Sequence, residues 1–230
     1  MIFPVAPSQH LNVLDRAERM LQWDPQVETR NAVSDLFLKW HQETEGAENI
    51  LNRRSAIYAL VNHPTFLDGP KLFQALSQAN VGLPVAGMTW LENFVGLPGK
   101  FVGKRSCTYP IQREIDPGNK YFQKMYGCIS KDLLAAGAAM NEKITRRLIE
   151  LLMAGKINLV AAATSTHRDV RDADSINQRT IRIIMDSGAT VIPVSFRNKP
   201  GSVIHKTITT FHPQIDSRID PVGALQAVSF

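Results

Sequence analysis

Cysteine and long apolar runs are both scarce in this chain of 230 residues. Its two cysteines, Cys107 and Cys128, form no Cys-x-x-Cys pair, which favours unpaired thiols in a reducing cytoplasm. The chain has no apolar run of about 18 residues, so no segment is predicted to span a bilayer. Residues 1–10 lack the basic and apolar regions of a secretory signal. These absences predict a cytoplasmic protein, either soluble or peripheral on the inner face of the membrane.

Motifs that mark several common protein classes are missing as well. The chain has no Gly-x-Ser-x-Gly elbow, which argues against a serine hydrolase. It has no glycine-rich phosphate loop and no cluster with metal-ligand spacing, so we expect no bound cofactor and no metal. The net charge of +5 favours anionic partners such as phosphates, coenzyme A, an acidic carrier protein or anionic lipid. The basic residues are scattered and form no nucleic-acid-binding motif, so we expect no nucleic acid.

The length and composition are those of one large α/β domain. With 44% hydrophobic and 20% charged residues, the chain is of the soluble globular type, and no repeat or Gly/Ser-rich linker divides it. Short apolar runs predict strands at 55–61, 81–88, 107–112, 157–164, 190–196 and 203–211. Because helical patterns separate these runs, we predict a mixed, mostly parallel central sheet with helices on both faces.

Amphipathic stretches define the predicted helices. They lie at 9–48 in two pieces, 69–79, 119–138, 141–154 and 176–187. A capping box from Ser175 to Gln178 begins the last helix, and Gly188 ends it. Pro193 favours an edge or an end for the strand that contains it. We predict a short N-terminal helical segment, 1–54, that packs on a main domain, 55–230, which forms one structural unit.

The stretch 55–70 holds the clearest candidate for catalysis. An apolar run ends at Val61, and Pro64 keeps the preceding residue, His63, out of helical geometry. Asp68 is placed to cap the next helix. An aspartate in that position can hydrogen-bond one imidazole nitrogen and orient the other as a general base. The alternative is a turn histidine whose contact with Asp68 is structural.

Two further pairs share the His-x4-Asp spacing. His10 belongs to a polar N-terminal lead with no strand before it, and we exclude it from the site. His167 follows an apolar run, but too little chain follows Asp172 for the remaining motifs. We therefore interpret His167 as a loop histidine near the site.

Four features follow one another in a fixed order: Asn-His-x4-Asp-Gly from Asn62, Tyr-Pro-Ile-Gln-Arg from Tyr109, Ala-Thr-Ser-Thr-His-Arg-Asp from Ala163, and Val-Ile-Pro-Val from Val191. This order resembles the four motif blocks of the glycerol-phosphate acyltransferase superfamily, over residues 55–196. Its members transfer a fatty acyl group from a thioester to a hydroxyl.

The third block departs most from the family pattern. It lacks the Phe-Pro-Glu-Gly-Thr-Arg of the lysophosphatidate acyltransferases. It is more similar to the Ala-Pro-Ser-Gly-Gly-Arg-Asp-Arg of the plastid and soluble glycerol-3-phosphate acyltransferases, with Thr166 and His167 in place of the two glycines. The departure makes an unusual acceptor a reasonable alternative.

The resemblance implies a role for each matched residue. His63 would take the proton of the acceptor hydroxyl, which attacks the thioester carbonyl directly, and Asp68 would hold the imidazole. Arginines suit the acceptor phosphate, because the guanidinium meets two phosphate oxygens and stays charged. Our order of preference for this role is Arg168, Arg113 and then Arg171.

The remaining expectations concern the substrates. Asn62, Ser165 and His167 lie in the matched blocks and are predicted to line the substrate site. The donor would be acyl-CoA or acyl-carrier protein, and the acceptor glycerol-3-phosphate or a lysophospholipid. Apolar and basic residues at 90–105 suit either a membrane interface or a core-facing helix. Two alternatives stay open: an acyltransferase for a non-phosphate acceptor, and a non-catalytic relative that binds lipid or coenzyme A.

Overall fold

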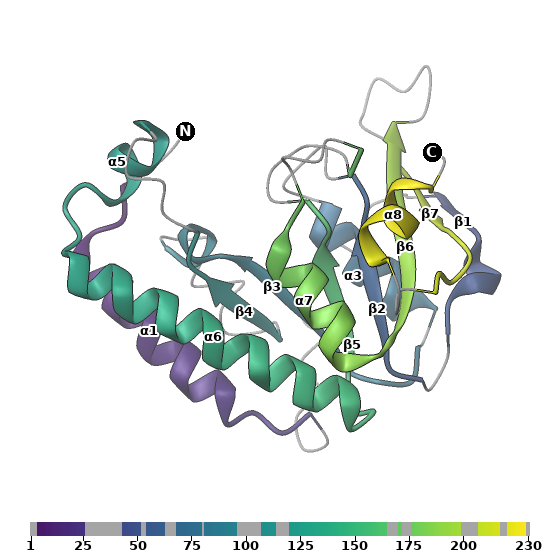
Figure 1. The fold of residues 1–230 in the computed structure, drawn as a ribbon, viewed down its shortest axis with the longest axis horizontal. Helices are drawn as coiled ribbons and strands as arrows, with labels where there is room; N and C mark the ends of the chain where they lie inside the picture. Colours follow the sequence, from purple (N-terminus) through teal and green to yellow (C-terminus); the bar gives the residue numbers. More distant parts are fainter. Residues whose placement is uncertain are drawn as a thin grey trace.

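A mostly parallel sheet forms the centre of the molecule (Figure 1). The computed structural model describes residues 4–25, 43–51, 54–62, 68–79, 81–95, 107–113, 120–164, 170–171, 176–198, 207–216 and 220–228. The described strands are β1 (Glu43–Glu45), β2 (Ala56–Leu60), β3 (Val85–Trp90), β4 (Thr108–Ile111), β5 (Asn158–Ala162), β6 (Thr190–Asn198) and β7 (Thr207–Phe211). Their order is β1-β7-β6-β2-β5-β3-β4, and β6 with β7 is the antiparallel pair. The predicted mixed, mostly parallel sheet is confirmed.

Helices cover both faces of this sheet. They are α1 (Pro7–Leu21), α3 (Asp68–Gln78), α5 (Lys120–Tyr126), α6 (Lys131–Met153), α7 (Gln178–Ser187) and α8 (Pro221–Gln226), with short 3-10 turns η1 (Ala47–Asn49) and η2 (Leu91–Phe94). Because successive residues of a strand point to opposite faces, β2 serves two cores. Tyr58 and Leu60 join the cluster beneath α3, while Ile57 and Ala59 join the larger cluster beneath α1, α6 and α7.

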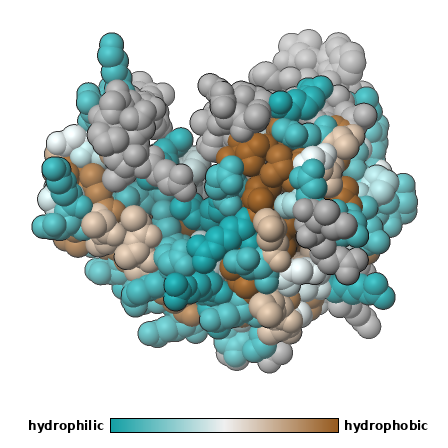
Figure 2. All heavy atoms as spheres, in the orientation of Figure 1, coloured by the Kyte–Doolittle hydropathy of each residue, from teal (hydrophilic) through white to brown (hydrophobic). Residues whose placement is uncertain are grey.

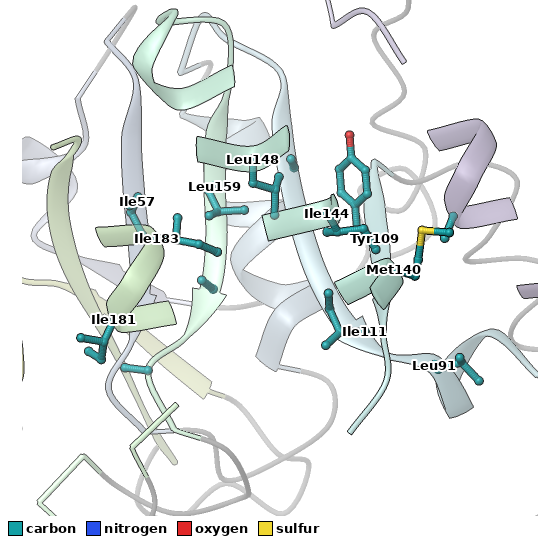
Figure 3. Packing of buried hydrophobic residues seen from close by; sticks show 14 of the residues in the cluster. Ile57, Leu91, Tyr109, Ile111, Met140, Ile144, Leu148, Leu159, Ile181 and Ile183 are labelled. Carbon is teal, nitrogen blue, oxygen red and sulfur yellow. The ribbon is translucent and has the colours of Figure 1, made fainter. Parts of the chain in front are cut away.

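The long helix α6 forms much of the larger core. Ile144 and Leu148 lie one turn apart on the same face and are fully buried. Figure 3 shows them beside Tyr109 of β4 and Leu159 of β5. Helix α1 runs alongside α6 (Figure 1), and Lys143 of α6 donates a hydrogen bond of 3.2 Å to Glu18 of α1. On the face seen in Figure 2, hydrophilic residues cover most of the described surface, and hydrophobic residues gather near the upper centre.

The helices predicted at 119–138 and 141–154 divide at a different place. Helix α5 ends at Tyr126, and α6 begins at Lys131 after Ser130, whose hydroxyl accepts a hydrogen bond from the Leu133 N–H. A serine N-cap supplies an acceptor for one of the free amides at a helix start, which fixes the boundary here. Residue 137, inside α6, is a glycine because a Cβ there would collide with the side chain of Gln112.

The second of the two helices expected within 9–48 is wrong at its end. Residues 43–45 form β1, which pairs in parallel with β7. Gly46 then turns at φ 68°, where a Cβ would meet the carbonyl oxygen of Phe211. The partner strand lies far along the chain, and all three β1 residues are exposed, so no local pattern indicates this strand. Residues 26–42 lie outside the described part.

Pro193 lies within the sheet rather than at an edge or a strand end. It stands opposite Ala59 of β2, and its carbonyl accepts a hydrogen bond from the His212 N–H. The N–H and C=O of one strand residue point to the same side, so the nitrogen of Pro193 also faces His212, just past the end of β7. No ladder hydrogen bond to β2 is therefore lost.

Two other boundaries also shift. Asn177 caps α7 by accepting a hydrogen bond of 3.3 Å from the Thr180 N–H, in place of Ser175, which lies outside the described residues. The predicted stop at Gly188 is confirmed by its left-handed conformation, φ 60°. Strand β3 begins at Val85 because Gly82, at φ 75°, still belongs to the preceding turn.

Candidate active site

The described residues that flank the predicted site lie at one edge of the sheet. Strands β2, β5, β3 and β4 are mutually parallel neighbours, so their carboxyl ends share that edge. Strand β6 runs parallel to β2, and its arrowhead marks the same edge in Figure 1. Ligands of open α/β sheets bind in this position, outside the carboxyl ends of the strands.

Asn62 joins the end of β2 to β6. Its side-chain Nδ2 donates to the Phe196 carbonyl at 2.8 Å, and its Oδ1 accepts from the Phe196 N–H at 2.8 Å. The amide thus pairs with β6 as another strand residue would. Asn62 was predicted to line the substrate site, but its polar atoms are engaged with the backbone. These two hydrogen bonds fix the chain directly before His63.

Asp68 is fully buried as the first residue of α3. The amino end of a helix stabilises a carboxylate, because the free N–H groups and the helix dipole favour negative charge. The ammonium of Lys71, one turn further, lies 3.8 Å from Asp68 Oδ1 and donates to Thr207 Oγ1 at 2.5 Å. Burial lowers the pKa of Lys71, and the charge of Asp68 opposes this shift.

The third motif block leaves the sheet beside the first. The Ala163 N–H donates to the Leu60 carbonyl, and the Val170 N–H donates to the Val61 carbonyl, both at 2.9 Å. The side chain of Gln226 in α8 donates to the Val170 carbonyl at 2.9 Å. The segments on either side of residues 165–169 are therefore tied to the end of β2. Arg171 follows the buried Val170 and is exposed.

Arg113 lies further along the same edge, at the end of β4. Its Nε donates to Glu92 at 2.6 Å, and its guanidinium lies 4.5 Å from the centre of the Trp90 ring. Strands β5 and β3 separate β4 from β2, which places the strand backbones roughly 14 Å apart at the usual spacing. The structure therefore holds Arg113 against β3 and does not bring it beside Asp68.

Four predicted site residues, His63, Ser165, His167 and Arg168, lie outside the described residues. The structure describes both flanks of each segment that contains them. Asn62 and Asp68 flank the first segment, and the third block is described up to Thr164 and again from residue 170. Within the described ranges, no group of three or more His, Cys, Asp or Glu side chains is placed to hold a metal ion.

Lys71 is the site feature that the sequence analysis missed. A lysine three residues after an aspartate lies on the same helix face, so the spacing offered a signal for this pair. The contacts of Val170 with Val61 and Gln226 had no such signal, because they join residues far apart in the chain.

The first part of the stretch considered for membrane contact packs inward. Leu91 and Phe94 of η2 are buried in the larger core, and the guanidinium of Arg16 in α1 lies 5.2 Å from the centre of the Phe94 ring. Residues 96–106 lie outside the described residues. Among the described helices, none is both long enough and apolar enough to cross a membrane.

Comparison with solved structures finds several chains of similar structure. No family model matches the chain, and no curated protein matches it. The crystal structure of the 1-acyl-sn-glycerophosphate acyltransferase PlsC from Thermotoga maritima is similar over 90% of this chain and 69% of its own, with a TM-score of 0.46 and 16% sequence identity. The site described above stands on the geometry of this chain alone.

Proposed function

We propose that the protein is an O-acyltransferase that moves a fatty acyl group from acyl-CoA or acyl-carrier protein to a hydroxyl of glycerol-3-phosphate or a lysophospholipid. The observation that carries the proposal is the hydrogen bond from the Val170 N–H to the Val61 carbonyl. It joins the chain beside the His-x4-Asp motif to the chain beside Arg168, at the edge where α/β sheets bind ligands. Acyl transfer to a phosphorylated acceptor needs both a general base and a phosphate-binding side chain at the same site.

In the proposed reaction, His63 acts as the general base. Its neutral imidazole takes the proton as the hydroxyl oxygen attacks the thioester carbonyl, and the carbon–sulfur bond then breaks. The imidazolium returns the proton to the departing thiolate, so atoms and charges balance without a covalent acyl-enzyme. Asp68 holds one ring nitrogen, which fixes the tautomer and stabilises the imidazolium. The burial of Asp68 at the start of α3 supports this role, because burial keeps the carboxylate fixed and away from bulk water.

Arginine side chains of the third block would bind the acceptor phosphate. We assign this role first to Arg168 and then to Arg171, whose neighbour Val170 is held at the end of β2. Arg113 ranks below both, because Glu92 and Trp90 already hold its guanidinium. Arg168→Ala should mainly raise the KM for a phosphorylated acceptor. An unchanged KM would remove the phosphate assignment.

Thiol release from palmitoyl-CoA, with and without glycerol-3-phosphate, tests the proposal. We expect acceptor-dependent release by the wild type and its loss in His63→Ala. His212→Ala is the matched control, because His212 is a half-buried histidine that contacts Ser195 in the middle of β6. Release by His63→Ala at the wild-type rate would refute the mechanism. Activity only with acceptors that lack phosphate would favour the alternative of a non-phosphate acceptor, which the replacement of two family glycines by Thr166 and His167 suggests.

A further inference from the structure

A lysine is buried next to the proposed catalytic carboxylate. The Lys71 side chain is only 9% exposed, and the Asp68 side chain only 1%. Burying a charged group is costly unless it is paired and hydrogen-bonded. Among the described Asp, Glu, Lys and Arg residues, only these two are buried. A buried cation and a buried anion in one helical turn indicate a pair rather than a coincidence of packing.

The two described strands that pack most closely on α3 add no charge next to the pair. Helix α3 packs on β5 and β7, and neither strand contains an ionisable residue. Tyr58 of β2 belongs to the same cluster, but burial raises its pKa to about 12, and its hydroxyl donates to the Leu51 carbonyl. The Tyr58 phenol is therefore neutral at ordinary pH. Lys71 therefore places a positive charge beside the Asp68 carboxylate within this buried cluster.

Thr207 gives the ammonium a fixed position. Its hydroxyl accepts the hydrogen bond from Lys71, and Thr207 is the first residue of β7. Because β7 is antiparallel to β6, this end of β7 lies at the carboxyl edge of β6, where the site is. The chain of contacts from Thr207 through Lys71 to Asp68 thus connects the sheet edge to the start of α3.

We propose that Lys71 is a positioning residue that holds the Asp68 carboxylate in place and keeps it ionised for its work on His63. The inference rests on the proposed function. Lys71 touches neither substrate nor the reacting atoms in this role. Its ammonium, held by Thr207, fixes the carboxylate from the side of the sheet and balances its charge.

Two kinetic consequences follow. In Lys71→Met, which keeps most of the side-chain volume, kcat should fall at least tenfold while the KM for the donor changes less than threefold. Loss of a nearby positive charge makes both Asp68 and the imidazole easier to protonate. The acid limb of the pH profile should therefore move to higher pH. Lys71→Arg keeps the charge and should recover part of kcat and most of the wild-type pH profile.

A double-mutant cycle in urea tests the pair without any assay of activity. It uses the wild type, Lys71→Met, Asp68→Asn and the double variant. We expect the unfolding equilibrium constant of the double variant to differ at least tenfold from the value for additive effects. The matched control is the exposed pair Lys143 and Glu18, whose cycle should be additive within twofold.

The outcomes separate this inference from the proposed function. An additive cycle for Lys71 and Asp68 overturns the inference, whatever the activity. Coupling with an unmoved pH profile and an unchanged kcat in Lys71→Met also overturns it. A wild type without acceptor-dependent release refutes the proposed function, and the cycle then decides whether Lys71 holds Asp68. If Lys71→Met does not fold, Thr207→Val replaces it, with a smaller fall in kcat expected and an unchanged kcat contradicting the inference.

Discussion

Asn62 offers a quantitative test of how the site is held. Replacing it by alanine removes both hydrogen bonds between its side chain and the backbone of Phe196. Phe196 is only 3% exposed, so its N–H and C=O would lose their partners in a largely buried place. Each unsatisfied buried group costs about 1–3 kcal/mol. Because Asn62 itself is half-buried, water can reach part of the gap, and we expect Asn62→Ala to lower the free energy of unfolding by about 2–3 kcal/mol.

Urea unfolding, followed by circular dichroism, measures this loss. Asn93→Ala is the matched control, because the Asn93 amide makes an exposed hydrogen bond of 2.7 Å to Thr89 Oγ1. Its loss should cost no more than about 0.5 kcal/mol. Equal losses for the two variants would refute the view that Asn62 continues the β2–β6 pairing. Acceptor-dependent thiol release should fall in Asn62→Ala even well below the urea midpoint, since the residue before His63 is no longer fixed.

Three further predictions concern the core and the dependence of stability on pH. Leu148→Ala should lower the free energy of unfolding in urea by about 2–5 kcal/mol, because it leaves a cavity in the core. The control Met153→Ala, at a residue 68% exposed, should change it by no more than about 0.5 kcal/mol. Equal losses would contradict the packing. Hydrogen bonds from Arg182, and then from Arg146, lower the pKa of Glu142 to about 2 from its ordinary value of 4.5. The stability from this exposed group is present above pH 4.5 and is lost as the pH falls toward 2. Glu142→Gln should therefore cost under about 1 kcal/mol at pH 7 and reduce the fall in the free energy of unfolding between pH 4.5 and 2. An unchanged fall would contradict the lowered pKa. Burial lowers the pKa of His10 below 6.5, so the stability from its neutral form is lost as the pH falls below about 6.5. His10→Leu should therefore weaken the pH dependence of the melting temperature between about pH 5 and 7. The same pH dependence in both proteins would show that His10 does not titrate there.

Local pattern predicted the elements whose side chains are all buried or clearly two-sided. The continuous apolar run that became β2 needs no partner to be recognised, because a strand covered on both faces is apolar throughout. Helix α3 was predicted in the same way from its apolar face, with Asp68 as its N-cap, and the structure has Asp68 as its first residue. The mostly parallel sheet followed from the alternation of such elements.

His10 shows a signal that was present and misjudged. The residues buried in α1 are His10, Val13, Leu14 and Ala17, which are spaced along one helix face. The interpretation of this segment as a polar lead was therefore wrong. Tertiary packing against Tyr126, whose ring centre lies 6.1 Å from that of His10, keeps the imidazole inside.

Features that depend on distant pairing could not be predicted. Strand β1 is polar and exposed and exists because β7 pairs with it. The same holds for the hydrogen bond from Val170 to Val61, which brings two motif blocks together although the sequence gives only their order. The roles of His63 and Arg168 remain predictions.

The measurement that tests the central claim most directly is the identification of the product. Purified protein is incubated with palmitoyl-CoA and glycerol-3-phosphate, and the mixture is analysed by mass spectrometry. The account predicts palmitoyl glycerol phosphate from the wild type and from His212→Ala, and none from His63→Ala. Free palmitate as the sole product would indicate thioester hydrolysis, and ester product from His63→Ala at the wild-type level would contradict the role of His63 as the base.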